Sequence, residues 1–298
     1  MDKIETMRAF IAVAQEGSFT SAGRRLGLST KLVSKYVRHL EGQLKTQLFN
    51  RTTRSVSLTD VGAAYLEHCR PILEQIDDLD SLVRERQGAL AGQIRLTAPT
   101  GFGSTRLSEA LVPFLRKHPD VEVDMRLTDH RLALVEEGLD LAIRIGALRD
   151  STLIARKLAG MPLVLCASPD YLERHGRPQD PRALSTHVCL VDSNQTELNT
   201  WRFHSGDEEQ VIRLHGAVRS NSPGALARMA MGGLGLTIAP LYAIEDALAD
   251  GRLERVLPEY KTDTFGLYAL YPPNRHLTRR VRALLDHLAA VFSSRWPD

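Results

Sequence analysis

Basic side chains gather between residues 20 and 58 of this 298-residue chain. The stretch holds eight lysines and arginines against one acid, Glu41, which is a net charge of +7, whereas the whole chain carries +2. The rest of the chain is therefore net acidic. This asymmetry is typical of an anion-binding module that is joined to a domain with another task. The basic residues are Arg24, Arg25, Lys31, Lys35, Arg38, Lys45, Arg51 and Arg54.

Polar and basic residues within this stretch repeat at helical spacing. They share one face of a predicted helix that starts near residue 30. Their hydroxyl, ammonium and guanidinium donors, with no acid among them, suit the base edges of the major groove. We predict base-reading contacts from Thr30, Lys31, Ser34, Lys35 and Arg38. The apolar stripe on the opposite face consists of Val33, Val37, Leu40 and Leu44.

Residues 50–58 alternate β-branched and hydroxyl side chains around Arg51 and Arg54. The alternation predicts a small β-hairpin, or wing, after the basic helix. Guanidinium groups on such a wing can pair with phosphates or enter a narrow minor groove. A hairpin that is only solvated is the alternative interpretation.

Two further helices are predicted before the basic one. Apolar residues recur at helical spacing up to Gly17, which ends the first helix. Ser18 can cap a second short helix, and Ser29 or Thr30 can cap the third. Two short helices across a glycine-containing turn make a helix-turn-helix. Residues 1–58 are therefore predicted to form a winged helix-turn-helix domain.

Residues 59–91 read as one long linker helix with a heptad seam of apolar residues. Such a seam needs a partner helix, and a second copy of the chain is the simplest one, because a two-fold dimer reads a symmetric DNA site. Packing onto the chain's own body is the alternative. Pro71 removes one backbone hydrogen bond and should bend the helix. The seam consists of Tyr65, Cys69, Ile72, Ile76, Leu79 and Val83.

Beyond residue 92, strands alternate with helices, the first of them expected over 107–115, which predicts a parallel sheet with helices on its faces. One unit covers 92–162, a second covers 163–265, and the chain returns to the first over 266–298. The expected fold class is thus multidomain α/β, with two subdomains joined by two crossovers.

The sequence lacks the common hydrolase, metalloprotease and nucleotide-binding motifs. Gly101-Phe102-Gly103, for example, lacks the third glycine of a dinucleotide-binding loop. A Ser-His-Asp arrangement assembled in space is the enzymatic alternative that sequence leaves open. We expect no catalytic residue, no metal site and no cofactor.

The three cysteines, Cys69, Cys166 and Cys189, have neither CxxC nor Cys/His spacing, so neither a disulfide nor a zinc site is expected. Buried thiols are the favoured interpretation of Cys166 and Cys189, with redox sensing as the alternative. The chain lacks an export signal and any run of about 18 uncharged apolar residues. These features predict a cytoplasmic protein that does not span a membrane. They also disfavour an exported solute-binding protein.

A set of ordered motifs resembles those of the LysR-type transcriptional regulators. The resemblance covers essentially the whole chain. It implies a winged helix-turn-helix, a dimerising linker helix and a periplasmic-binding-protein-like domain that holds a small effector between two subdomains. The implied partners are double-stranded DNA, a homodimer mate within a homotetramer, the effector and RNA polymerase. The motifs are Ser18-Phe19-Thr20-Ser21-Ala22, Leu32-Val33-Ser34-Lys35, Leu40-Glu41, Leu48-Phe49-Asn50-Arg51, Leu58-Thr59-Asp60-Val61-Gly62, and Gly232 to Leu236 with Pro240.

Three positions depart from the family pattern. Lys35 stands where the family often has arginine, and lysine lacks the planar two-pronged donor that suits guanine, so base preference there should be softer. Gly42 lies inside the predicted helix. Lys45 occupies the place where similar proteins usually have the glycine that ends it.

The resemblance places the effector in the cleft between the subdomains, beyond the ends of the strands, where open α/β sheets also bind ligands. Helix starts at this edge offer N–H groups suited to an anion. The resemblance implies a small carboxylated effector, so an organic acid is expected. Helix capping or turn formation explains each of these residues equally well. The candidate effector contacts are Thr100, Phe102, Thr128, Ile145, Asn221 and Ser222, with Asp129 and Gly146 beside them.

Overall fold

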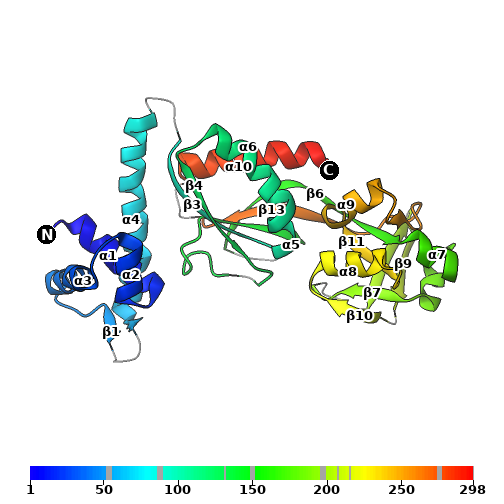
Figure 1. Ribbon diagram of the computed structural model, residues 1–298, viewed down its shortest axis with the longest axis horizontal. Helices are drawn as coiled ribbons and strands as arrows, with labels where there is room; N and C mark the ends of the chain where they lie inside the picture. The colour runs from blue at the N-terminus through cyan, green and yellow to red at the C-terminus, as the bar shows by residue number, and fades with distance from the viewer. Residues whose placement is uncertain are drawn as a thin grey trace.

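The computed structural model describes residues 1–51, 56–85, 90–130, 132–147, 152–194, 199–206, 208–214, 216–273 and 277–297. Three parts follow one another along the long axis of the molecule (Figure 1). A small helical domain lies at the N-terminal end, one long helix stands beside it, and an α/β domain of two lobes extends to the other end. None of the described helices is both long and apolar enough to cross a membrane.

Three capped helices build the N-terminal domain. Asp2, Ser18 and Ser29 each accept a hydrogen bond from a backbone N–H of the first turn that follows, which satisfies donors that a helix start leaves open. Ser29 rather than Thr30 is therefore the cap of the basic helix. The helices are α1 (Lys3–Glu16), α2 (Phe19–Leu26) and α3 (Thr30–Leu44).

The turn between α2 and α3 depends on Gly27, whose φ is +65°, a left-handed conformation that side chains disfavour. The end of α3 is left-handed too, although Lys45 occupies it with a φ of +54°. The helix runs through Gly42 without a break. The helix-turn-helix thus forms although Gly42 and Lys45 depart from the family pattern.

Apolar faces of α1 and α3 meet in the core of this domain. Phe10 of α1 and Val33, Val37 and Leu40 of α3 are fully buried there. The fourth member of the predicted stripe, Leu44, is 37% exposed. It belongs to the last turn of α3, which extends beyond the surface that α1 covers.

The wing is a two-stranded hairpin of β1 (Phe49–Arg51) and β2 (Val56–Leu58), paired antiparallel. Its tip, with Arg54, and the side chain of Arg51 lie outside the described residues. The linker helix starts so close behind the wing that a Cβ on Gly62 would lie 2.0 Å from the carbonyl oxygen of Leu48. Only glycine fits at this contact.

The linker helix, α4 (Asp60–Glu85), packs its first half onto the N-terminal domain. Cys69 and Leu73 are buried in that domain's core, and Tyr65 and Ile76 pack against it. The seam residues Tyr65, Cys69 and Ile76 therefore pack onto the chain's own N-terminal domain, which was the alternative to packing against a second chain. Ile72 is 47% exposed. The side chains of Leu79 and Val83 lie outside the described residues.

One mixed sheet runs through both lobes in the order β10-β7-β11-β6-β13-β5-β3-β4, with β12 paired to β6. The outer pairs are parallel, as predicted, but β6 and β13 are antiparallel to each other and to β11 and β5. A wholly parallel sheet is therefore wrong. The reason is that β6 and β13 are the two crossovers, one leading into the second lobe and the other back. The strands are β3 (Gly92–Ala98), β4 (Val121–Leu127), β5 (Leu141–Gly146), β6 (Ile154–Ala167), β7 (Cys189–Asp192), β10 (Gly216–Ser220), β11 (Leu236–Pro240), β12 (Glu254–Arg255) and β13 (Thr264–Tyr271).

A separate hairpin of β8 (Thr200–Ser205) and β9 (Glu208–Arg213) belongs to the second lobe. The first helical segment of the α/β domain begins at residue 100, earlier than predicted, and passes through a π-helical turn at Gly103–Leu107. The helices are α5 (Thr100–Phe102), α6 (Ser108–Lys117), α7 (Pro169–His175), a 3-10 helix (Pro181–Thr186), α8 (Pro223–Met231), α9 (Leu241–Ala249) and α10 (Arg279–Arg295).

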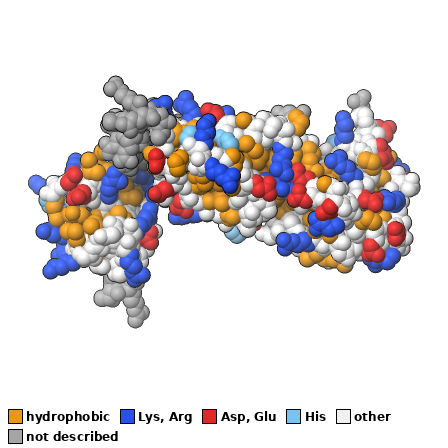
Figure 2. Space-filling model, turned by 45° about the horizontal axis from the view of Figure 1, so that its top comes forward, with side chains coloured by type: hydrophobic (Ala, Val, Ile, Leu, Met, Phe, Trp, Pro, Cys, Tyr) orange, Lys and Arg blue, Asp and Glu red, His pale blue; other side chains and the backbone are white. Residues whose placement is uncertain are grey.

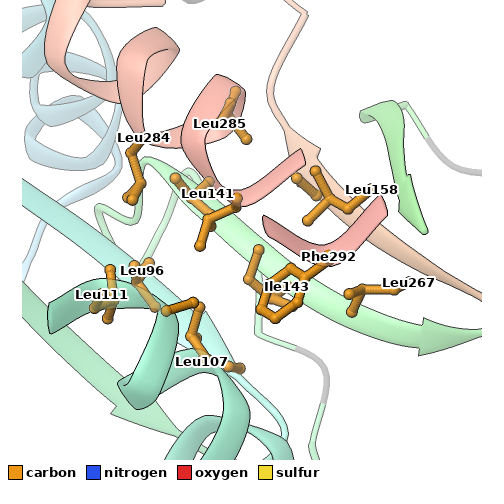
Figure 3. Packing of buried hydrophobic residues seen from close by; sticks show 14 of the residues in the cluster. Leu96, Leu107, Leu111, Leu141, Ile143, Leu158, Leu267, Leu284, Leu285 and Phe292 are labelled. Carbon is orange, nitrogen blue, oxygen red and sulfur yellow. The ribbon is translucent and has the colours of Figure 1, made fainter. Parts of the chain in front are cut away.

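Each lobe has its own apolar core. In the first lobe, Leu96, Leu141 and Ile143 of the sheet meet Leu284 and Phe292 of α10 (Figure 3). These α10 residues belong to the first core, so the C-terminal helix packs in the first lobe. The second lobe packs around Tyr171, Trp201 and Phe203.

All three cysteines are buried and unpaired. Burial raises the pKa of the Cys69 thiol to about 11 and those of Cys166 and Cys189 to about 12. Thiols with such pKa values remain protonated near neutral pH, and the protonated form is a poor nucleophile. This environment supports the interpretation of Cys166 and Cys189 as packing residues.

Candidate functional site

The exposed face of α3 carries donors and no acid. Thr30, Lys31, Lys35 and Arg38 are exposed, and Ser34 is half-buried on the same face. The Arg38 guanidinium donates to the Ser34 hydroxyl at 3.3 Å, so these two side chains are already held together. Lys and Arg side chains are visible at the outer end of the molecule over the N-terminal helices (Figure 2). The structure thus brings the five predicted base-reading residues onto one surface.

Glu41, the single acid of the basic stretch, points inward. Its Oε1 accepts hydrogen bonds from the backbone N–H groups of Leu48 (3.0 Å) and Phe49 (3.3 Å), where the wing begins. The carboxylate therefore fixes the wing to α3 and leaves the exposed face of that helix basic. Its position in the sequence carries no signal for this role.

A cavity of about 650 Å³ opens between the two lobes, a volume typical of small-molecule sites. Side chains of both lobes line it. Leu132, Leu134 and Leu270 come from the first, and Trp201 and Ile238 from the second. A ligand held here would touch both lobes at once.

The predicted effector residues divide into two groups. Thr128 and Ile145 line the cavity, together with Asp129 and Gly146. The other four, Thr100, Phe102, Asn221 and Ser222, are not among its lining residues.

Phe102 is fully buried in the first core, where its ring contacts Tyr242 and Phe292. Sequence placed it at the cleft because it follows a strand end, but the early start of the helix at residue 100 turns it inward. The hydroxyl of Ser222 caps α8 by accepting from Ala225 N. Asn221 accepts through its backbone carbonyl from the Asn194 amide at 2.7 Å. For Phe102, Asn221 and Ser222, core packing, turn formation and capping are therefore the roles that the contacts support.

A carboxylate of the chain itself already occupies the helix start at Thr100. Its backbone N–H donates to the carboxylate of Asp129 at 3.0 Å. A ligand carboxylate would therefore have to replace the chain's own carboxylate at this N–H group.

Among the described residues, three aspartates and two arginines line the cavity. Asp192 is buried at the end of β7, and burial, with a smaller effect of the charge on Asp129, raises its pKa. Arg144 donates to the backbone carbonyls of Ile143 and His130 at 2.9 and 3.2 Å. Arg202 pairs with Glu209 at 2.9 Å. The third aspartate, Asp263, lies 3.3 Å from a ring nitrogen of His204.

Sequence reasoning missed several of these lining residues. Asp192 follows the buried run 189–191 directly, and Arg144 interrupts another buried run. A charge that ends or interrupts an apolar strand is a signal that could have identified both. Tyr242, the second residue of α9, is uncharged and carries no such signal.

An ion-pair cluster ties the lobes behind the cavity. Arg106, in the π-helical turn, is 8% exposed and contacts Glu245 and Asp246 of α9, both at 2.6 Å. The other face of α9 packs into the second lobe through Ile244 and Ala247. The cluster therefore fixes α9 between the two lobes.

Arg70 joins the linker helix to the first lobe. It is 7% exposed and donates to the backbone carbonyl of Val135 at 2.6 Å. A Cβ on Gly138 would lie 2.6 Å from the same guanidinium, so glycine makes room for it. The contacted segment continues directly from Leu132 and Leu134, which line the cavity.

Two family models match the chain. The model of the bacterial regulatory helix-turn-helix protein, lysR family, matches residues 4–63, and the LysR substrate binding domain matches residues 87–293. The HTH-type transcriptional regulator PtxR of Pseudomonas aeruginosa is 36% identical over 280 residues, which are 94% of this chain and 90% of PtxR. The HTH-type transcriptional activator AaeR of Escherichia coli is 32% identical over 98% of this chain and 94% of AaeR.

A solved structure agrees over the full length. CrgA, a LysR-type transcriptional regulator from Neisseria meningitidis, superposes with a TM-score of 0.63 at 28% identity, covering 96% of this chain and 98% of CrgA. The helix-turn-helix, the linker helix and the two-lobed domain thus occur in the same order as in a regulator of known structure. The chain belongs to the LysR family of transcriptional regulators, with an N-terminal DNA-binding helix-turn-helix and a C-terminal effector-binding domain.

Proposed function

We propose that this regulator reads double-stranded DNA with the exposed face of α3, while the wing holds the phosphates. The observation that carries the proposal is the acid-free face of Lys31, Lys35 and Arg38, which the inward position of Glu41 preserves. Phosphate contacts supply affinity through counterion release, and base-edge contacts supply sequence preference. No catalytic step is part of this function.

Binding titrations against single-base variants of a bound site test the base-reading role. Lys35→Ala or Ser34→Ala should cost about 1–3 kcal/mol and relax preference at one position. Arg54→Ala, predicted to remove a phosphate contact, is the matched control and should weaken binding to all variants alike. Equal losses on every variant for Lys35→Ala and Ser34→Ala would remove both residues from the reading role.

The regulator is proposed to act as a homodimer through α4, with two dimers forming a homotetramer. Support comes from Val61 and Ile72, which are 52% and 47% exposed on this helix within one chain. A two-fold dimer also doubles the DNA contact area and matches a symmetric site. Action in the cytoplasm, with RNA polymerase as a further partner, completes the proposal.

A small effector in the cavity is proposed to alter DNA binding or bending through Arg70. The segment after β4 lines the cavity with Leu132 and Leu134. In the same segment, the backbone carbonyl of Val135 accepts a hydrogen bond from the Arg70 guanidinium. Cys69, the neighbour of Arg70, is buried in the core of the DNA-binding domain. A shift of this segment is therefore transmitted within a few residues to the domain that holds α3.

Coupling between two sites is reciprocal, so DNA binding should in turn change the cavity segment. We expect amide hydrogen exchange over residues 128–139 to change when the wild-type protein binds a DNA duplex, and the change to be lost in Arg70→Gln. Arg126→Gln is the matched control, because Arg126 pairs with Glu137 of the same segment at 3.0 Å. The coupling fails if DNA leaves this exchange unchanged in the wild type, or changes it equally in Arg70→Gln.

A further inference from the structure

One end of the inter-lobe cavity gathers hydrogen-bond acceptors. Asp129 comes from the loop after β4, Asp192 from the end of β7 and Tyr242 from the start of α9, and all three line the cavity. Asp129 accepts from the backbone N–H of Thr100 at 3.0 Å, and the Tyr242 hydroxyl lies 3.2 Å from where a Cβ on the next residue, Gly101, would stand. The charges of Asp129 and Asp192 also contribute, after burial, to the raised pKa of Tyr242. This acceptor end draws on both lobes.

The Tyr242 hydroxyl is a polar group with an open position. The side chain is 6% exposed, and no hydrogen-bond partner for its hydroxyl is found among the described residues. The hydroxyl is not among the described buried atoms that lack a partner, so the ring is buried while its oxygen opens to the cavity. Tyr242 faces the cavity, so a group entering the cavity can supply that partner.

We propose that the effector carries a protonated amine on an apolar body and that the amine binds at the acceptor end formed by Asp129, Asp192 and Tyr242. This inference rests on the proposed effector role of the cavity and names the class of its ligand. An ammonium group has three N–H donors and no acceptor. It therefore matches two carboxylates and a phenol oxygen.

A carboxylate fits this end poorly. The N–H group of Thr100, the donor that an anion would use, already binds Asp129. A ligand carboxylate beside Asp129 and the buried Asp192 would add a third negative charge, and like charges at short range disfavour one another's ionised form. A cation reverses the sign of this interaction and forms charge-assisted hydrogen bonds. On this inference the effector is an amine, in place of the organic acid expected from sequence.

The remainder of the cavity suits an apolar body. Leu134, Leu153 and Leu270 of the first lobe and Trp201 of the second line it. Arg144 lies on the wall of the first lobe and already donates to two backbone carbonyls. The volume of about 650 Å³ leaves room for an aromatic ring with a short side chain.

Isothermal titration of the full-length protein at neutral pH tests the ligand class. The probes are benzylamine, 2-phenylethylamine and tryptamine, each compared with the alcohol and the carboxylate of the same carbon skeleton. At least one amine should bind more tightly than its alcohol, and the carboxylates should bind most weakly. Asp192→Asn and Asp129→Asn should each weaken amine binding about tenfold or more.

Asp286→Asn is the control, because Asp286 pairs with Arg156 at 2.7 Å and is not among the residues that line the cavity; it should leave amine affinity within about twofold. Tyr242→Phe should weaken amine binding while the protein remains folded. The inference is overturned if a carboxylate binds better than its amine, if Asp192→Asn binds the amine as tightly as the wild type, or if no amine binds at millimolar concentration. DNA retention by the same preparations separates the two ideas: its loss contradicts the proposed function, whereas retention without amine binding contradicts only the ligand class.

Discussion

At the scale of single residues, carboxylates decide what the two sites can bind. Glu41 turns inward and bonds the backbone where the wing begins, so the reading face of α3 remains basic. Asp129 occupies the helix start that a ligand anion would use. Both functions follow from where the carboxylate points, which the residue type does not reveal.

Asp192 should make stability depend on pH. Because burial raises its pKa above the ordinary 3.8, the folded state favours the protonated acid. That stabilisation is fully present below the ordinary pKa and is lost as the pH rises through the raised one. Asp192→Asn should therefore raise the melting temperature relative to the wild type at pH 7 and change it least near pH 4.

Melting curves from pH 4 to pH 7 check this prediction. Asparagine keeps an acceptor for the Asn194 N–H, which Asp192 binds at 2.9 Å, so the comparison isolates the charge. Asp263→Asn serves as the control. If the difference in melting temperature between the wild type and Asp192→Asn does not vary with pH, ionisation of Asp192 does not destabilise the folded state.

Sequence predicted the residues of the reading face well because helical spacing and charge are local properties. It predicted the cavity wall less well. Thr128 and Ile145 line the cavity because they end strands, whereas Phe102 also follows a strand and is buried. The difference depends on where the next helix starts, which tertiary packing around Tyr242 and Phe292 decides.

At the scale of elements, α9 is the piece that both lobes share. Arg106 holds it from the first lobe, while Ile244 and Ala247 anchor it in the second. Tyr242, at its start, faces the cavity. If the lobes moved relative to each other, either the ion pairs of Arg106 would break or α9 would move together with the first lobe.

Arg106→Gln should destabilise the protein by about 1–3 kcal/mol, because it removes a nearly buried guanidinium from Glu245 and Asp246, while Arg295 still pairs with Glu245 at 2.9 Å. Arg252→Gln is a matched control, since Arg252 forms a fully exposed pair with Asp250, and exposed pairs contribute little. Urea unfolding of both variants provides the measurement. Equal midpoints for Arg106→Gln and the wild type would mean that the cluster does not hold α9.

The strand order illustrates what the alternation of strands and helices can predict. Two subdomains with two crossovers were predictable, because 162–166 and 266–270 are strand-like runs on either side of the second unit. Their antiparallel pairing was not, since direction depends on which lobe each strand enters. The prediction that the whole apolar seam of the linker helix faces a second chain was wrong in part for a similar reason. Cys69 and Ile76 have the right spacing, but they pack against their own N-terminal domain.

At the scale of the whole molecule, charge separates the tasks. The N-terminal domain and α4 stand at one end of the long axis, and the α/β domain extends to the other (Figure 1). The acidic acceptor end belongs to the cavity between the lobes, and Arg70 of α4 contacts the segment that lines this cavity. This contact is the route that we propose for a signal from the cavity to the DNA-binding domain. The family pattern makes this order predictable, whereas the Arg70 contact depends on packing between segments 65 residues apart.

Retention of genomic DNA fragments at increasing salt tests the central claim most directly. Binding that relies on phosphate contacts should weaken steeply, with the logarithm of affinity falling linearly in the logarithm of salt. Loss of one phosphate-binding arginine should reduce that slope by about 1. We expect specific fragments to be retained by the wild-type protein and released as salt rises. Purified protein that retains no fragment at any salt concentration, with or without amines present, would contradict DNA recognition by this chain.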